Sequence, residues 1–95
     1  MEKVKTTVIG AGQIGKRHVE VLNKMSDFVE ILSIADIDQS RGSDLARLAK
    51  AKYYPDYNDV FQDKPDLAII CVPHWLHKEV GIATAQAGVS MLMEK

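Results

Sequence analysis

The sequence predicts an α/β fold in which a parallel sheet carries helices on both faces. Apolar segments of strand length alternate along the chain with segments whose apolar residues recur at helical spacing. Three glycines stand within six positions where the first strand passes into the first helix. Strands that alternate with helices of this length need right-handed crossovers, which makes the sheet parallel. The 95 residues, 46% of them hydrophobic, suffice for one small domain.

The first half of the chain provides two strands and two helices. TTVIG (residues 6–10) is apolar on both faces, which is typical of a central parallel strand. VEILSIAD (residues 29–36) predicts a second strand that ends on a carboxylate, and the helix after it is expected to begin near Ser40 or Ser43. Between these strands, apolar offsets of 4, 7, 8 and 11 predict a helix. Its predicted buried face comprises Ile14, His18, Val21, Leu22 and Met25.

The second half adds three strands and one long helix. KYY (residues 52–54) reads as a short edge strand, and DYNDVF (residues 56–61) as a single helical turn. PDLAIICVP (residues 65–73) is the strongest buried strand in the sequence. A helix follows, ended by Gly88 in a left-handed conformation. VSMLM (residues 89–93) is the last strand, so about five strands are expected.

Charge and composition exclude several classes of partner. The net charge is −1, the isoelectric point is about 6.3 and the basic residues are scattered, which argues against nucleic acid. The longest apolar run, residues 67–72, is too short to span a bilayer. The one cysteine, Cys71, lies in that run and fits a buried thiol in a reducing compartment. We therefore expect a cytoplasmic protein without nucleic-acid or membrane partners.

Gly10, Gly12 and Gly15 fit the pattern G-x-G-x-x-G between a strand and a helix, as in Rossmann-type dinucleotide-binding folds. The first glycine permits a sharp turn, the second lets the backbone approach a pyrophosphate, and the third lets helix and strand pack closely. The amides of Gln13, Ile14 and Gly15 then face the phosphates at the helix start. The alternative is a turn that uses glycine for geometry alone.

Asp36 ends the second strand 21 residues after Gly15, close to the ~20 expected of an acid that binds the adenosine ribose. Its charge would repel a 2′-phosphate, which favours NAD over NADP. Arg41 follows five residues later and could cover a 2′-phosphate, so NADP stays possible. Asp38 is a rival for the ribose, although a solvated loop acid is its simpler interpretation.

The whole chain resembles the N-terminal domain of the glucose–fructose oxidoreductase, inositol dehydrogenase and rhizopine-catabolism family (Gfo/Idh/MocA). Four segments carry the resemblance nearly end to end and in the family's order. They are VIGAGQIGKRH (residues 8–18), IADID (residues 34–38), KPDLAIICVPHWLH (residues 64–77) and AGVSMLMEK (residues 87–95). The resemblance implies a Rossmann-type doubly wound sheet and an oxidoreductase that uses NAD or NADP.

The resemblance also implies roles for two further segments. Where the family usually has Thr-Pro-Asn-x-x-His along the nicotinamide, Pro73 and His77 match, while Val72 and His74 replace the threonine and asparagine. The backbone of this segment is therefore assigned to the cofactor, with Val72, Pro73 and His77 as the binding residues. Glu94 and Lys95 match the start of the family's Glu-Lys-Pro motif. By position Glu94 is assigned to the cofactor and Lys95 to catalysis, as a cation that favours alkoxide-like character at a substrate hydroxyl.

Other histidines have simpler interpretations. His18 lies on the predicted buried helix face, where a hydrogen-bonded core histidine is favoured over a ligand contact. His74 and His77 are three residues apart, but no third ligand type clusters nearby, so we expect no metal. Trp75 could either shield the loop or fill space.

The family adds a further strand and a large substrate domain, so residues 1–95 are expected to be a dinucleotide-binding domain cut short at its C-terminal end. We expect the parent protein to oxidise a sugar, cyclitol or related hydroxyl compound, and this chain alone to be inactive. A non-catalytic NAD(P)-sensing module of the same superfamily is the alternative, and a Rossmann-type methyltransferase is disfavoured. The last strand would be an exposed edge, which predicts self-association here or a homo-oligomer in the parent.

Overall fold

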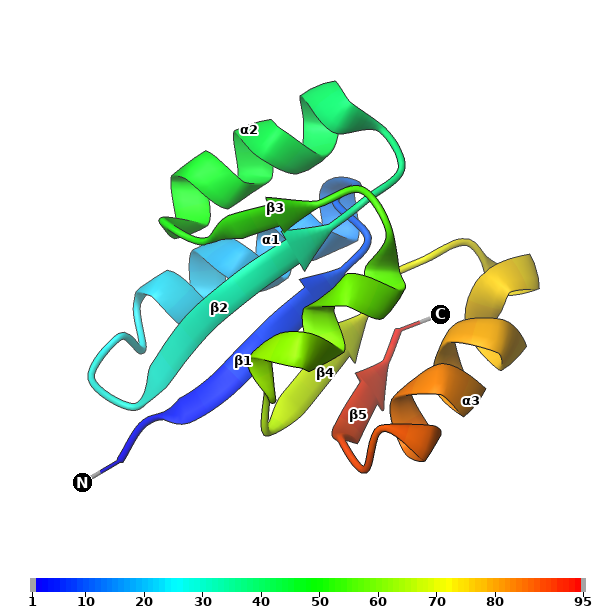
Figure 1. Cartoon of the computed structure of the whole chain (residues 1–95). Helices are drawn as coiled ribbons and strands as arrows, with labels where there is room; N and C mark the ends of the chain where they lie inside the picture. The colour runs from blue at the N-terminus through cyan, green and yellow to red at the C-terminus, as the bar shows by residue number, and fades with distance from the viewer. Residues whose placement is uncertain (1, 95) are drawn as a thin grey trace.

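The computed structural model describes residues 2–94, which form a five-stranded, all-parallel sheet (Figure 1). The strand order is β3-β2-β1-β4-β5. The strands are β1 (Val4–Ile9), β2 (Val29–Ala35), β3 (Lys52–Tyr54), β4 (Leu67–Ile70) and β5 (Ser90–Met93). The predicted α/β fold with a parallel sheet is confirmed, and each predicted strand is present within a few residues of its expected bounds.

Helices cover both faces of the sheet. The helical elements are α1 (Gln13–Asn23), α2 (Gln39–Ala49), the 3-10 helices η1 (Tyr57–Asp63) and η2 (His74–Leu76), and α3 (His77–Gln86). Helices α1 and α2 pack on one face, and η1 and α3 pack on the other (Figure 1). The arrangement is therefore a doubly wound sheet.

Two buried clusters form the core, one on each side of the sheet. Because successive strand side chains point to opposite faces, neighbours in one strand enter different clusters. Val8 packs with α1 and α2, whereas Ile9 packs with η1 and α3. This two-sided burial explains why β4 is a continuous apolar run rather than an alternating one.

The chain reverses its winding direction at β1. Strands β2 and β3 lie to one side of β1, and β4 and β5 lie to the other. The connections that leave the carboxyl ends of β1 and β4 therefore diverge, α1 passing to one face and η2 and α3 to the other. Open α/β sheets bind ligands in the crevice at such a switch point.

The predicted buried face of α1 is wrong in detail. The buried residues are Gly15 and Val19, with Leu22 partly buried, whereas Ile14 and Val21 are 40% and 51% exposed. The close approach of Gly15 to the first strand rotates the helix, so that its buried line runs through residue 15. Met25 lies beyond the helix end and is also exposed.

Several local predictions also need correction. The segment predicted as one helical turn is the seven-residue 3-10 helix η1. The Cys71 thiol, predicted to be buried, is only half-buried because it follows β4 into the crevice. Gly88 has a φ of +73°, as the predicted helix stop requires. Among residues 2–94, no helix combines the length and hydropathy needed to cross a bilayer.

Candidate dinucleotide-binding site

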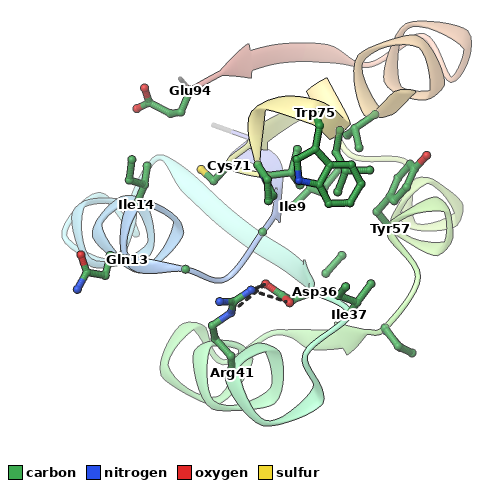
Figure 2. A pocket seen from close by; sticks show the side chains of 18 residues that line it. Ile9, Gln13, Ile14, Asp36, Ile37, Arg41, Tyr57, Cys71, Trp75 and Glu94 are labelled. Atoms are coloured by element: carbon green, nitrogen blue, oxygen red, sulfur yellow. Dashed lines mark hydrogen bonds and ion pairs between the residues drawn. The ribbon is translucent and has the colours of Figure 1, made fainter. Parts of the chain in front are cut away.

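A cleft of about 330 Å³ opens at the carboxyl ends of the central strands (Figure 2). Ile9 and Gly10 line it from the end of β1, Asp36 from the end of β2, and Cys71 and Val72 from the end of β4. Its position coincides with the switch point. The cleft therefore lies where this class of sheet binds its ligands.

The first and third glycines allow a tight junction between β1, α1 and β4. Gly10 has a φ of +106°, and a Cβ there would lie 2.5 Å from the carbonyl oxygen of Cys71. A Cβ on Gly15 would lie 2.1 Å from the carbonyl oxygen of Gly10. Neither position has room for a side chain, so both glycines serve the packing roles expected of them.

The second glycine faces open space. A Cβ on Gly12 would meet no protein atom within 4 Å, although Gly12 is the N-cap residue of α1 and lines the cleft. No side chain caps this helix start, and its first turn contains no acidic residue. Gln13 and Ile14 follow at the cleft wall. The first-turn amides, which lack partners within the helix, thus form a site suited to an anion.

Asp36 is fixed beside the glycine turn by backbone donors. Its Oδ2 accepts from the amide of Ala11 at 2.7 Å, and its Oδ1 accepts from the amide of Asp38 at 2.8 Å. Beneath it, the hydroxyl of Tyr53 donates to the Asp36 carbonyl oxygen at 2.7 Å. Burial of Tyr53 and the charges of Asp36 and Asp38 raise the pKa of Tyr53, which keeps this donor protonated.

Arg41 covers the same carboxylate from α2. Its Nε donates to Asp36 Oδ2 at 3.3 Å, and its Nη2 lies 3.0 Å and 3.2 Å from Oδ2 and Oδ1 (Figure 2). Asp38 is the N-cap residue of α2, and its Oδ1 accepts from the Arg41 amide at 3.0 Å. Asp38 is exposed and lies in the loop before α2, as the interpretation as a solvated loop acid expects, and its side chain also caps that helix.

The loop after β4 contributes Val72 and Pro73 to the cleft wall. His77 was assigned to the cofactor but is absent from the residues that line the cleft. Its Nε2 lies 3.0 Å from the Val72 carbonyl oxygen, so the His77 side chain stabilises the loop and does not face the cleft. Within residues 2–94, no three His, Cys, Asp or Glu side chains are placed to share a metal ion.

Glu94 enters the cleft from the end of β5 and pairs with His18 on α1. Its Oε2 lies 2.6 Å from His18 Nε2. Burial, followed by the charge of Glu94, raises the pKa of the Cys71 thiol to about 11. His18 is thus hydrogen-bonded, as expected, but to a cleft residue rather than within the core. Lys95, the predicted catalytic residue, lies outside the described residues.

Sequence reasoning missed part of the cleft wall. Ile37, Pro55 and Tyr57 line the cleft, and Trp75, whose role was left open, projects over it with 76% of its surface exposed (Figure 2). Tyr57 donates to Glu79 Oε2 at 2.7 Å, and burial with that hydrogen bond raises its pKa to about 12. Two of these residues could have been found from their position in the sequence, because Ile37 and Pro55 lie just beyond the carboxyl ends of β2 and β3, where the cleft opens.

A doubly wound parallel sheet, a glycine turn at its switch point and an acid at the end of β2 define a Rossmann-type dinucleotide-binding domain. Comparison with known families agrees with this class. Residues 4–95 match the model of the oxidoreductase family with an NAD-binding Rossmann fold (GFO_IDH_MocA), and the chain belongs to this family.

Individual relatives are similar over the whole chain. Inositol 2-dehydrogenase from Klebsiella pneumoniae is 31% identical, with 97% of this chain and 28% of that protein covered. Myo-inositol dehydrogenase from Lactobacillus casei, solved with NAD(H) and myo-inositol, is 26% identical with a TM-score of 0.91, covering 99% of this chain and 29% of that one. WlbA dehydrogenase from Chromobacterium violaceum, solved with NADH and UDP-GlcNAcA, is 25% identical with a TM-score of 0.94, covering 100% and 28%. The chain thus spans little more than a quarter of its curated relatives' length.

Proposed function

We propose that this chain is the dinucleotide-binding part of an oxidoreductase that transfers hydride between NAD and a hydroxyl compound. The observation that supports this most directly is the pairing of an open helix start at Gly12 with the buried acid Asp36, on opposite sides of one glycine turn. An anion and a ribose are the two ligand groups that this pair suits. A dinucleotide carries both.

Each predicted cofactor residue has a role in this proposal. The pyrophosphate lies against the amides of Gly12, Gln13 and Ile14, while Gly10 and Gly15 allow the turn that places them. The adenosine ribose lies towards Asp36. The nicotinamide end lies along Val72 and Pro73, with Glu94 beside it and His77 holding the loop.

The chemistry centres on the far end of the cleft. A nicotinamide held along Val72 and Pro73 would supply the hydride acceptor for oxidation of a substrate hydroxyl. Lys95, which follows Glu94, is proposed to stabilise the developing negative charge on that oxygen. The pair of Glu94 with His18 would fix the end of β5 beside the cleft.

The proposed substrate class is a sugar, cyclitol or related polyol. Two of the relatives described above are inositol dehydrogenases, and WlbA was solved with UDP-GlcNAcA. We further propose that residues 1–95 alone bind dinucleotide weakly and turn nothing over, since they correspond to only 28% of the length of the inositol 2-dehydrogenase. The substrate pocket would then come from additional chain.

Strand β5 supports a proposal about association. It is an edge strand, and all four of its residues are exposed. Met91 and Met93 lie on the side of α3, where they would contact a Cβ placed on Gly81, whereas Leu92 points to the other face and is 48% exposed. An apolar edge with unpaired backbone groups favours pairing with another strand. We propose that copies of this chain associate through it.

Dinucleotide binding can be measured with the chain's own fluorophore. Trp75, the sole tryptophan, lies at the cleft mouth, so a titration with NADH should quench its emission in a saturable way. Gly12→Val places a branched side chain in open space and should weaken binding about tenfold or more without unfolding the protein. Gly88→Asn, at the distant end of α3, is the matched control. No saturable quenching by NADH in the unsubstituted chain would contradict the proposal.

A further inference from the structure

Two carboxylates line the cleft from opposite sides. Asp36 follows β2 and is fixed by backbone donors, whereas Glu94 follows the edge strand β5 (Figure 2). The Glu94 side chain is 39% exposed, and its backbone amide donates to the Ile70 carbonyl oxygen at 2.9 Å. A long, partly exposed side chain gives up considerable rotamer freedom when it is held in one place. The Glu94 carboxylate therefore needs a partner if it is to keep one position in the cleft.

His18 supplies this partner from α1. Its Nε2 lies 2.6 Å from Glu94 Oε2, and because a carboxylate only accepts, the imidazole N–H is the donor. Hydrogen bonds that involve a charged group are shorter and stronger than neutral ones. His18 follows Gly15 by three residues, and the close approach of Gly15 to Gly10 fixes the start of this helix. A firmly placed helix thus holds a side chain from an exposed strand.

The pair leaves one oxygen of the Glu94 carboxylate free. Within residues 2–94, Oε1 accepts no hydrogen bond. The charge of Glu94 reaches the cleft, because it adds to the effect of burial in raising the pKa of Cys71, which also lines the cleft. A negative charge repels phosphates, which suit the helix start at Gly12 instead. Oε1 is therefore suited to a neutral donor, such as a hydroxyl or an amide.

Resting on the proposed function, we propose that His18 is a positioning residue, which holds Glu94 so that Oε1 accepts from a neutral donor on the nicotinamide half of the dinucleotide. That half offers two kinds of neutral donor, the hydroxyls of its ribose and the amide of its carboxamide group. His18 acts only through Glu94, since His18 does not itself line the cleft. Loss of the pair is thus expected to weaken binding of the nicotinamide half and to leave binding of the adenosine diphosphate half unchanged.

The test measures dissociation constants by isothermal titration for NADH, for ADP-ribose, which lacks the nicotinamide, and for ADP, which also lacks the second ribose. His18→Ala should weaken NADH binding about tenfold, the effect of losing one hydrogen bond to a charged group, and should change ADP binding by less than about twofold. His18→Gln keeps an N–H donor and should recover most of the loss. Arg17→Ala is the matched control, because it removes an exposed cation from the same helix.

A double substitution shows whether His18 acts through Glu94. Glu94→Ala should reproduce the effect of His18→Ala, and the two together should weaken NADH binding no further than either alone. Additive losses would overturn the positioning role. Circular dichroism shows whether each variant keeps the fold. If His18→Ala does not, Glu94→Ala carries the comparison of NADH with ADP, because Glu94 lies beyond the end of an edge strand.

The outcomes separate this inference from the function beneath it. If the unsubstituted chain binds none of the three ligands, the proposed function fails. If it binds them, and His18→Ala leaves NADH binding unchanged or weakens ADP binding equally, the positioning role is overturned. An equal loss in Arg17→Ala also overturns it, because the general charge of α1 would then explain the result. A loss for NADH and ADP-ribose supports the role with a ribose hydroxyl as the donor, and a loss for NADH alone supports it with the carboxamide.

Discussion

Residues 10–15 and Asp36 form one side of the cleft, which we call the glycine side. Backbone contacts from β1, β4, α1 and α2 hold these residues in place. The other side of the cleft, which we call the edge side, comprises residues 71–77 and 90–94. Residues 71–77 follow β4, and residues 90–93 form β5, whose residues are all exposed. The glycine side has no room for one added carbon at two positions. The edge side has a free strand edge, an exposed tryptophan and a half-buried thiol. Under the proposed function, the chain therefore builds firmly the part assigned to the pyrophosphate and ribose and leaves the part assigned to the nicotinamide open.

The largest expected effect is a loss of folding stability caused by a substitution on the glycine side. Gly10→Ala should destabilise the fold by about 3 kcal/mol, because the left-handed φ strains alanine and the new Cβ meets the Cys71 carbonyl. Urea denaturation followed by circular dichroism measures this loss. Gly88→Ala is the control: its φ is +73° but its Cβ would meet nothing within 4 Å, so only about 1 kcal/mol should be lost. Equal losses would show that steric contact at Gly10 contributes nothing.

The second prediction concerns the edge side alone. Leu92→Lys should abolish self-association while leaving the free energy of unfolding nearly unchanged, because the side chain is half-exposed and a lysine on an edge strand opposes pairing. Sedimentation velocity over a range of concentrations measures association. Ile82→Lys, on the exposed surface of α3, is a control that should not alter it. A monomeric unsubstituted chain at high concentration would contradict the proposed edge pairing.

The smallest effect concerns Cys71, on the edge side of the cleft. Its pKa of about 11 makes the thiolate fraction at pH 8 roughly a hundredfold lower than at the ordinary value of 9.0, so iodoacetamide should react slowly. Because folding raises this pKa, the associated stability is complete below the unfolded thiol pKa and is lost as the pH rises towards 11. Mass spectrometry at several pH values gives the alkylation rate.

The contribution of Glu94 to the raised pKa of Cys71 can be tested separately. Glu94→Gln removes the charge that adds to the effect of burial, so the midpoint of the alkylation profile should move to lower pH. The shift should be smaller than the one caused by burial, which is the larger cause. A midpoint near 9 in the unsubstituted chain would contradict the half-buried environment of Cys71.

The glycine side was also the part that the sequence predicted best. Strand, glycine turn and helix follow one another locally, and the spacing from Gly15 to Asp36 reflects a single β-α-β unit. The prediction that was wrong there is which side of α1 faces the core, that is, the rotation of the helix about its own axis. Ile14 fits an apolar stripe by spacing, but the contact of Gly15 with Gly10 decides which side of α1 is buried, and that contact is not a matter of periodicity.

The edge side was harder to predict because its contacts join distant segments. The pair of His18 with Glu94 links residues 76 positions apart, and the bond of His77 to the Val72 carbonyl depends on a loop shape that apolar patterning does not describe. Ile37 and Tyr57 line the cleft through topology rather than motif. The ion pair of Arg41 with Asp36 could not be predicted from spacing, because it depends on where the two side chains point.

We propose above all that the helix start at Gly12 and the acid at Asp36 bind a dinucleotide. The most direct test is an NMR titration of the labelled chain with NADH, following every backbone amide. We expect the largest shifts at Gly12, Gln13 and Ile14, with further shifts at Asp36 and Val72. Shifts confined to the opposite end of the sheet, around Lys3, Glu30 and Lys50, where a second cavity lies, would contradict it.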